Sequence, residues 1–566
     1  MDNEKVEPQK LPREVYQELE NIVTSVWISE DRANIEGYSR GIVMPTEILP
    51  KHMKDKTVLP ACIVLPENSE QVQAVVRVCN RNKVPVLPYT NGQLGSVASV
   101  PGTLCIHFAR MDKIVSINEE NMTATLQPYV SYQQLQAAAM KKGLWNGGCP
   151  LATGITRVAS QFAGAGIWQT DLKYGTLSRN IISVKMVMPN GDLLITGSAG
   201  QAGAEDFCEY SPGPDIIGFA RSSLGTIGIV TEITVKLHTW VGGSTFPDDV
   251  GHPSIDTYYK DVEEKKFDRP ALPDRHKIYW LEFPDYESEL EGLYKIAQSG
   301  IGIGLNAAGV YSDFYCSQTS EMTNSRTQEG FFPPWNCYVM LAGISSEKQL
   351  EYEEKVLKQI ADETKAKFLS DGYKPELLDA LAPWSQDCFR HVTGMRMCRG
   401  GWAGLVIPMG RISMVPKFSE IWCEALAKLG ETHITDRGGC DSTPFIYVVN
   451  RGHFQYCETD TYPETHSDPQ GLNQSMALFA YSWAACVKEK LSPGSIVSMM
   501  VEPFHSLFPE IGPNSNLLFR KVRGAFDPTG IFAPGKLVFT EEELKQVPDM
   551  IKDPVMKLRE MVGLKN

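Results

Sequence analysis

The sequence predicts an α+β protein of several domains, and three observations carry this prediction. From about Leu59 onward, short apolar runs alternate with amphipathic helical patterns, as in sheets that are covered by helices. After about residue 243 the chain changes to long charged helices, aromatic loops and further strands. The 566 residues are 42% hydrophobic, so a large core is available, and roughly 150 residues per domain gives two to four domains. The alternation by itself also fits an α/β arrangement.

The first elements are clear in the residue pattern. A strand at 61–66 leads to a helix at 69–82, which Ser69 can cap and which carries a stripe of buried-type residues from Val72 to Cys79. A strand at 84–89 follows, and further strands are expected at 103–109 and 124–130. The next helix begins at Ser131 and ends at Gly143, where glycine is a normal helix stop.

The following segment is rich in small residues and turns. Residues 147–166 hold glycine and alanine at a density that permits close approach of the backbone to a ligand. The turn Asn190-Gly191 between two β-type runs predicts a hairpin. Another expected strand, within 215–240, contains Gly225 and Gly228, and glycine weakens a strand unless something approaches closely.

Elements of a different kind fill the second half. A long charged helix is expected at 347–364 and a strand at 445–450, and 516–539 reads as a helix, a Pro/Gly-rich turn and an extended tail. An amphipathic helix at 541–562 ends the sequence. We detect no internal repeat and no low-complexity linker, so the domains should pack firmly.

Charge and cysteine content exclude several classes. The net charge of −14 and the absence of a dense basic block argue against a nucleic acid partner. The 13 cysteines are scattered without a C-x-x-C pair, so neither a zinc site nor a disulfide framework is expected, and no metal is predicted. Without a signal-type N-terminus or an 18-residue apolar window, we expect a soluble, cytoplasmic protein with reduced thiols and no membrane span.

Two glycine-containing segments are candidate ligand loops. Pro88 to Val97, PYTNGQLGSV, could cradle a phosphate with its backbone amides, although it matches neither a P-loop nor a Rossmann turn and a plain turn explains it equally well. More specific is the combination of Gly164-x-Gly166, Lys173-Tyr174-Gly175 and the run SSLGTIGIVTEI.

Five blocks in this order identify a family resemblance. They are VLPENSEQVQAVVRVCNRNKVPVLPYTNG, LQPYVSYQQLQAAAMKKGL, KYGTLSRNIISVKMVMPNGDLL, DIIGFARSSLGTIGIVTEITVKL and FRKVRGAFDPTGIFAPGKLV. The sequence resembles FAD-linked oxidases of the vanillyl alcohol oxidase and p-cresol methylhydroxylase type, over residues 59–240 and 515–540.

The resemblance implies a discontinuous FAD-binding domain with an inserted cap. The implied division is 1–242 for a two-part FAD-binding domain of the p-cresol methylhydroxylase type (core about 55–240), 243–509 for a cap or substrate domain, and 510–566 for the return of the chain. The cap should be an antiparallel sheet flanked by helices. The residues implied to bind FAD are Pro88, Thr90, Asn91, Gly92, Gln93, Leu94, Gly95, Ser96, Pro150, Gly154, Ser160, Gly164, Tyr174, Gly175, Gly225, Gly228, Ile229, Val230 and Lys536.

Departures from the family pattern bear on substrate and cofactor attachment. Gln93-Leu94 replaces an Arg-Asn pair in the phosphate loop, Thr176 replaces an acidic residue, and Val501 to His505 replaces a Tyr-Arg pair. These changes put oxidation of para-phenols in doubt. Ser442 and Thr443 stand where a flavin-linking histidine is expected, so FAD should be non-covalent.

Candidate catalytic residues come from three segments. His505 or Glu502 could act as the base, since the histidine pKa lies near working pH. Tyr447 and Arg451 share one face of the expected strand and could both point into a pocket, although packing explains a strand tyrosine equally well. Arg396 and Arg399, with Asp387, Arg390 and His391, form a surface-like charged run that could instead clamp a carboxylate.

The functional hypothesis is an FAD-dependent oxidoreductase, EC class 1, that oxidises a small alcohol or hydroxylated aromatic compound by hydride transfer to flavin N5. The alternatives are a 2-hydroxy acid dehydrogenase of the same superfamily, its non-redox ether-lipid synthase chemistry, and a flavin-binding electron-transfer subunit. A homodimer is expected, and a protein could be the electron acceptor.

Overall fold

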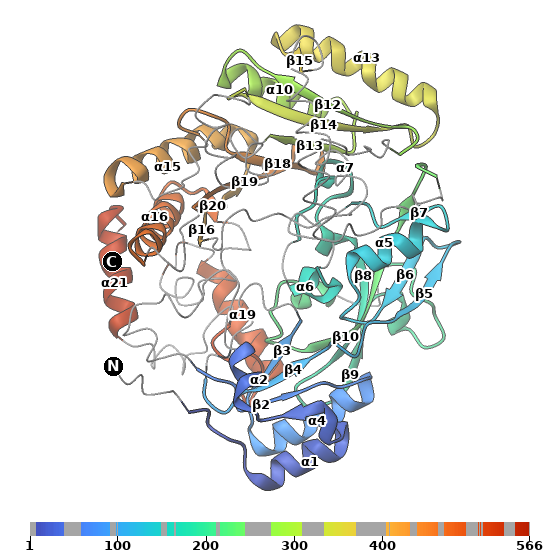
Figure 1. Ribbon diagram of the computed structural model, residues 1–566, viewed down its shortest axis with the longest axis vertical. Helices are drawn as coiled ribbons and strands as arrows, with labels where there is room; N and C mark the ends of the chain where they lie inside the picture. The colour runs from blue at the N-terminus through green and yellow to red at the C-terminus, as the bar shows by residue number, and fades with distance from the viewer. Residues whose placement is uncertain are drawn as a thin grey trace, which may run out of the picture.

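A computed structural model describes most of the chain and is shown in Figure 1. The described residues are 7–38, 58–90, 98, 100–148, 156–163, 166–210, 215–243, 273–307, 333–369, 403–406, 408–430, 439–461, 469–493, 508, 510, 513–536 and 549–564. Figure 1 shows two smaller sheets from the first half of the chain in the lower part of the molecule, and a large sheet with its helices above them. None of the described helices is long and apolar enough to span a membrane.

The first sheet has the strand order β1-β2-β4-β3 among the described residues. Its strands are β1 (Ile28–Ser29), β2 (Cys62–Val64), β3 (Val86–Tyr89) and β4 (Leu104–His107), with β2, β3 and β4 parallel. Helices α1 (Arg13–Val23) and α4 (Ser69–Asn82) pack together and share a core with it. The predicted helix 69–82 is confirmed, but its cap is Asn68, whose side chain accepts a hydrogen bond from the Gln71 amide at 2.9 Å.

The C-terminal part of the chain completes this sheet. Val86 of β3 donates its amide to the Ile531 carbonyl and accepts from the Ala533 amide, each at 2.8 Å. The buried Phe532 between them thus sits in register with Val86. Helix α19 (Pro513–Phe526) precedes this segment, and the Asp527 carboxylate accepts the Phe532 amide at 2.8 Å.

The second sheet is antiparallel and has the order β5-β6-β10-β8-β9. Its strands are β5 (Ile114–Asn118), β6 (Thr123–Leu126), β8 (Ile181–Val187), β9 (Leu193–Ile195) and β10 (Ile229–Lys236), and α5 (Tyr132–Met140) and α6 (Val158–Ala163) share its core. Ser131 caps α5 with a capping box, so the predicted start is confirmed to within one residue. The predicted hairpin at Asn190-Gly191 joins β8 to β9, with Gly191 at φ 84°.

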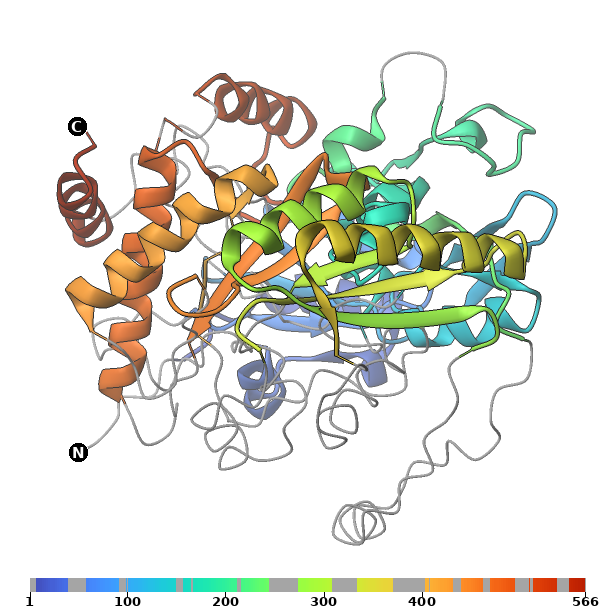
Figure 2. The same ribbon diagram turned by 90° about the horizontal axis from the view of Figure 1, so that it is seen from above.

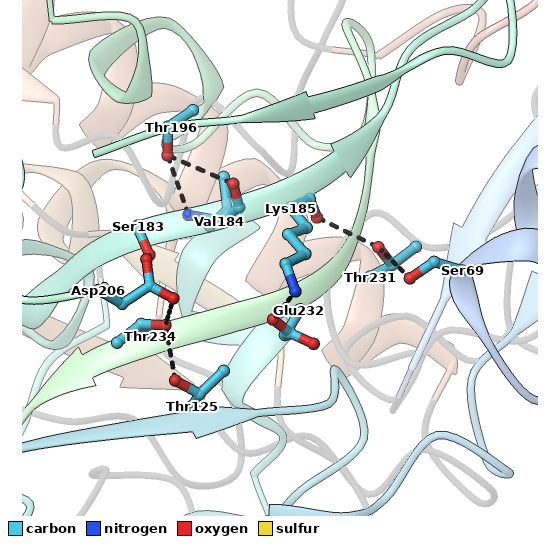
Figure 3. Close-up of polar contacts among 10 residues, drawn as sticks. All are labelled: Ser69, Thr125, Ser183, Val184, Lys185, Thr196, Asp206, Thr231, Glu232 and Thr234. Carbon is cyan, nitrogen blue, oxygen red and sulfur yellow. Dashed lines mark hydrogen bonds and ion pairs between the residues drawn. The ribbon is translucent and has the colours of Figure 1, made fainter. Parts of the chain in front are cut away.

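Polar side chains line the other face of the second sheet. Figure 3 shows Thr125 of β6, Thr234 of β10 and Ser183 of β8 linked through Asp206, whose carboxylate accepts from Ser183 at 2.6 Å and from Thr234 at 3.2 Å. Ser69, the first residue of α4, donates to the Thr231 hydroxyl at 2.9 Å in the same view. This bond ties the helix of the first sheet to a strand of the second.

The large sheet is antiparallel and has nine strands in the described part of the chain. Its main order is β15-β12-β14-β13-β18-β19-β17-β20, with β16 paired to β19. The strands are β12 (His276–Glu282), β13 (Gly304–Ala307), β14 (Asn336–Ala342), β15 (Lys367–Phe368), β16 (Ala403–Val406), β17 (Pro408–Gly410), β18 (Phe445–Val449), β19 (Phe454–Thr461) and β20 (Ser492–Pro493).

Two similar units build this sheet. The first runs β12, α10 (Tyr286–Gln298), β13, β14, α13 (Glu347–Thr364), β15, and the second runs β17, α15 (Val415–Leu429), β18, β19, α16 (Pro469–Lys488), β20. When the four strands of each unit are numbered along the chain, their order across the sheet is 4-1-3-2 in both units. The second strands of the two units, β13 and β18, pair antiparallel and so join the units. The expectation of no internal repeat was therefore wrong for the fold, because the repetition lies in strand order and not in residue identity. Figure 2 shows α10 and α13 lying together across the sheet.

Three further expectations can be compared with the structure. The α+β class is confirmed by the mixture of helices and antiparallel sheets. Gly225 and Gly228 do not lie inside a strand, because β10 begins at Ile229. Cys423 and Cys440 form a disulfide, so the expectation of unpaired thiols was wrong at these two positions. The domain boundaries at 242 and 509 stay predictions. The amphipathic helix that was expected at the end of the sequence is α21 (Asp549–Met561).

Candidate functional site

The carboxyl ends of β3 and β4 hold a cluster of aromatic and basic side chains. We call Tyr38, Tyr89, His107, Tyr129 and Arg157 the strand-end cluster. The Tyr38 hydroxyl and His107 Nδ1 are hydrogen-bonded at 2.7 Å, and the His107 ring meets the edges of Tyr89 and Tyr129 at centroid distances of 5.4 and 5.3 Å. Burial, with the nearby Arg157 charge, lowers the pKa of His107 to about 4, so this imidazole is neutral at ordinary pH.

Several residues expected to bind FAD lie next to this cluster. Thr90 follows β3 directly, and its hydroxyl lies 2.7 Å from the Ser160 hydroxyl of α6. Lys536 is buried just after the segment that pairs with β3. The structure therefore brings Ser160 next to Thr90, and it places Lys536 just after the residues that pair with Val86 of the same strand as Pro88.

The two glycines before β10 have close protein neighbours. A Cβ on Gly225, which has φ +77°, would lie 2.4 Å from Pro88 Cγ, and one on Gly228 would lie 2.5 Å from the Met186 side chain. Packing against these side chains accounts for both glycines without a ligand. Their role at the cofactor, with that of Ile229 and Val230, stays a prediction.

A second group of residues lies around Tyr174 and Gly175. Tyr174 ends the short helix α7 (Asp171–Tyr174) and lies against the His238 ring at a centroid distance of 4.2 Å. His238 Nε2 is 3.0 Å from the Asn180 Oδ1, and burial with the charges of Lys236 and Lys173 lowers the His238 pKa to about 4. Gly175 follows, with its carbonyl accepting from the Trp168 indole.

One face of the large sheet is turned toward these loops. Directly opposed residues on neighbouring strands form a line across it, which we call the sheet-face row: Trp280, Tyr338, Asn306, Tyr447 and Tyr456. All five are buried, and Asn306 Nδ2 donates to the Gln169 carbonyl at 3.1 Å. Residues of the opposite face, such as Leu281 and Val339, share a core with α10 and α13.

Several buried polar atoms at this junction have no hydrogen-bond partner among the described residues. They are Trp280 Nε1, Asn306 Oδ1, Gln169 Oε1 and both carboxylate oxygens of Asp171. Helix α7, which begins at Asp171, packs against β13 and β18. Buried polar groups normally have partners, so this junction suits a ligand that carries hydroxyl or carbonyl groups.

Asp171 is the most unusual of these groups. It is fully buried, and burial raises the pKa of its carboxyl well above the ordinary range. The raised pKa favours the protonated carboxyl, which can donate a hydrogen bond.

Arg451 does not have the position expected from its sequence. Strand β18 ends at Val449, and Arg451 lies in the following turn, η6 (Asn450–Gly452), with φ 56°. Its guanidinium donates to the Ile301 carbonyl. The expected pairing of Tyr447 and Arg451 on one strand face was therefore wrong, because the left-handed turn breaks the alternation.

Other predicted site residues lie outside the described part of the chain. They are the candidate base residues His505 and Glu502, the arginines Arg396 and Arg399, and the loop residues Asn91, Gly92, Gln93, Leu94, Gly95, Ser96, Pro150, Gly154 and Gly164. No group of three or more His, Cys, Asp or Glu side chains in the described ranges is arranged to hold a metal ion.

Residue patterns missed Trp280, Asn306, Asp171, His107 and Arg157. None belongs to a recognisable motif. Trp280 and Asn306 become neighbours of Tyr338 only through strand register, which a single sequence does not reveal.

Comparison with known proteins identifies the cofactor. Residues 60–197 match the family described as FAD binding domain. Glycolate oxidase subunit GlcD of Bacillus subtilis is 32% identical over 181 residues, which are 32% of this chain and 37% of that protein. The mitochondrial cytochrome-type D-lactate dehydrogenase of Arabidopsis thaliana is 28% identical over 197 residues, 33% of each chain. The chain thus spans well under half of the length of these curated relatives.

Solved structures extend the likeness to nearly the whole fold. 4-Ethylphenol oxidase from Gulosibacter chungangensis superposes with a TM-score of 0.71 at 17% identity, covering 95% of this chain and 99% of that one. p-Cresol methylhydroxylase also gives 0.71, at 16% identity, covering 94% and 99%. The α+β fold is thereby confirmed. FAD as the cofactor is confirmed by the match of residues 60–197 to the FAD binding domain. Thr90, Ser160 and Lys536 fit a cofactor that needs hydroxyl and cationic donors.

Proposed function

We propose that the chain, which has an FAD binding domain match and the fold of p-cresol methylhydroxylase, is an FAD-dependent oxidoreductase that oxidises a small alcohol or hydroxylated aromatic compound. The sheet-face row carries this proposal. Its aromatic side chains suit a flat substrate, and Trp280 Nε1 and Asn306 Oδ1, which have no hydrogen-bond partner among the described residues, suit a hydroxyl group on it.

FAD is proposed to lie between the strand-end cluster and the sheet-face row. Thr90, Ser160 and Lys536, with the loop 91–96, would hold it. When bound, FAD supplies a two-electron acceptor that takes a hydride from the substrate carbon at N5.

The residues of this chain then have three tasks. Tyr338 and Tyr447 form an aromatic wall that orients the substrate ring, and Trp280 Nε1 donates to a substrate oxygen. The neutral Asp171 carboxyl donates a second hydrogen bond. The hydroxyl proton that leaves as the hydride departs goes to a base, for which His505 and Glu502 are proposed.

The second candidate is oxidation of a 2-hydroxy acid. The relatives named for glycolate and D-lactate favour it, although their likeness covers about a third of the chain. Arg396 and Arg399 would then bind the substrate carboxylate, because a guanidinium donates two fixed hydrogen bonds.

Anaerobic bleaching of the flavin distinguishes these candidates. Purified holoprotein is mixed with aromatic alcohols, alkylphenols, aliphatic alcohols and D-2-hydroxy acids, and the loss of flavin absorbance is followed. Bleaching by the first three classes supports the lead proposal, and bleaching by hydroxy acids alone supports the second. A flavin that no compound bleaches would refute both and leave an electron-transfer subunit.

Two variants on opposite faces of β12 locate the substrate. Trp280→Phe should slow bleaching about tenfold, because it removes the Nε1 donor that is proposed to bind the substrate oxygen. Tyr279→Phe is the control, because Tyr279 lies on the opposite face and its hydroxyl donates to Glu354 of α13. Equal effects of the two changes would place the substrate elsewhere.

The expected homodimer, the cytoplasmic location and the electron acceptor also remain proposals. Analytical ultracentrifugation tests the first, and reoxidation by oxygen compared with cytochrome tests the last.

A further inference from the structure

Arg157 is a cation without a counter-ion among the residues that the structure describes. Its guanidinium lies over the Tyr129 ring at 4.0 Å, and it makes no hydrogen bond or ion pair with any described residue. The Nε atom is buried from solvent. A half-buried guanidinium normally binds a carboxylate, a carbonyl or a phosphate, so this one is available to a ligand.

The backbone around Arg157 is firmly placed. Arg157 forms an isolated β-bridge with Ser131, the capping residue of α5, and α6 begins at the next residue, Val158. The Val158 amide also donates to the Val130 carbonyl at 3.0 Å. The guanidinium is therefore presented from a fixed position.

The position is one where nucleotides bind in sheets of this kind. The strand-end cluster lies at the carboxyl ends of the parallel strands β3 and β4, where open sheets with parallel strands hold their ligands. Thr90 and Ser160, whose hydroxyls are 2.7 Å apart, adjoin the cluster in sequence. Except for Tyr38, the cluster lies within the residues that match the FAD binding domain.

The charges around Arg157 favour an anion. His107 is the neighbouring titratable group, and its pKa is lowered by burial and by the Arg157 charge, with no carboxylate acting on it. The cluster therefore has one permanent positive charge and a neutral imidazole. Two anions could use it, the diphosphate of FAD or a substrate carboxylate.

We propose that Arg157 binds the diphosphate of FAD, with Tyr129 supporting its guanidinium and the hydroxyls of Thr90 and Ser160 beside it. The diphosphate is favoured over a substrate because the sheet-face row, where the substrate is proposed to bind, belongs to the large sheet. The sequence predicted that backbone amides mainly hold the phosphates, and this proposal adds a side-chain cation. The proposal rests on the FAD-binding match, and its choice of the diphosphate over a substrate rests on the proposed function.

Ligand binding to the apoprotein tests this proposal without any substrate. Apoprotein made under riboflavin limitation is titrated with FAD, ADP and riboflavin, and affinities are measured by calorimetry or flavin fluorescence. Arg157→Gln should weaken FAD and ADP about 10- to 100-fold, the range for a charged hydrogen bond, and leave riboflavin unchanged. Arg157→Lys should restore part of the loss, and wild-type FAD binding should weaken with salt more than that of Arg157→Gln.

Arg110 provides a matched control. It also lies over an aromatic ring, Trp27, at 4.3 Å, but it is paired with Glu67 at 2.7 Å and with the Leu65 carbonyl at 3.0 Å. Arg110→Gln should leave the ratio of ADP to riboflavin affinity unchanged.

Three results would overturn the proposal. They are unchanged affinity of Arg157→Gln for FAD and ADP, an equal loss for riboflavin, and a raised KM for acidic substrates at unchanged FAD affinity. The second would indicate a purely structural role, and the third would assign Arg157 to the substrate. Circular dichroism of each variant shows whether it is folded.

Discussion

A side chain on Gly175 would collide with Asn450, because its Cβ would lie 2.7 Å from the Asn450 Oδ1. Gly175 follows α7 in the FAD-binding part, and Asn450 begins the turn after β18 of the large sheet. The absence of a side chain at Gly175 therefore sets how closely the two parts of the molecule approach.

Gly175→Ala should destabilise the protein by more than its backbone strain. Gly175 has φ 66° and ψ −174°, a region open essentially only to glycine, where other residues cost about 1 to 3 kcal/mol. Gly143→Ala is the control, because Gly143 has φ +69° but no atom within 4 Å of its Cβ position. Thermal unfolding followed by flavin fluorescence should show a larger drop in Tm for Gly175→Ala, and equal drops would exclude the collision.

Two half-buried histidines should make stability fall in mild acid. The pKa values of His107 and His238 are lowered to about 4, first by burial, whereas a histidine in the unfolded chain titrates near 6.5. Between these values the unfolded chain binds protons that the folded protein does not. The free energy of unfolding should therefore fall by about 1.4 kcal/mol per pH unit for each histidine as the pH drops from about 6.5 to about 4.

Urea unfolding at several pH values checks this slope. His238→Gln should reduce this slope by the contribution of one histidine. A slope that His238→Gln leaves unchanged would contradict the assignment.

Asp171 should make the free energy of unfolding fall as the pH rises, which is the opposite of the effect of the two histidines. Burial holds its folded pKa well above the unfolded value of about 3.9, so above pH 4 the unfolded chain loses this proton first. Stability is then lost at about 1.4 kcal/mol per pH unit as the pH rises toward the folded pKa. Asp171→Asn removes this dependence, and its unfolding free energy should rise relative to wild type between pH 4 and pH 7. Parallel curves for the two proteins would show that the carboxyl is ionised when folded.

The disulfide should contribute measurably to stability. Cys423 of α15 and Cys440 are 17 residues apart in sequence, and closing a loop of about this length stabilises a protein by about 3 kcal/mol. Cys423→Ser should lower the urea midpoint, and dithiothreitol should lower that of wild type but not of the variant. Peptide mapping without reduction should recover the linked pair, and two free thiols there would contradict it.

The sequence predicted elements better than it predicted the site. Helices 69–82 and 347–364 were correct because apolar residues recur at helical spacing and capping residues mark their starts. Gly225 and Gly228 were wrongly placed inside a strand, which begins at Ile229. A glycine indicates that something lies close, but not whether this is a ligand or a side chain such as those of Pro88 and Met186.

A single sequence does not reveal which residues become neighbours through strand register. Asn306 is one polar residue in a short strand, and only its position opposite Tyr338 and Tyr447 makes it part of a buried row. The prediction for Arg451 was wrong for a related reason, because the strand ends at Val449 and Arg451 lies in the left-handed turn that follows. The repeated strand order of the large sheet likewise leaves no trace in residue identity.

The pairing of Ile531 to Ala533 with Val86 has a consequence for biosynthesis. A ribosome makes β3 early and its edge partner more than 440 residues later, so the first sheet remains open while the whole large sheet is being translated. The inserted units are therefore translated before the domain that encloses them is complete, and Lys536, which is proposed to bind the cofactor, is translated after them. Full FAD binding is then a property of the finished chain, and loss of its last forty residues should abolish flavin retention even though every residue from 60 to 197 is intact.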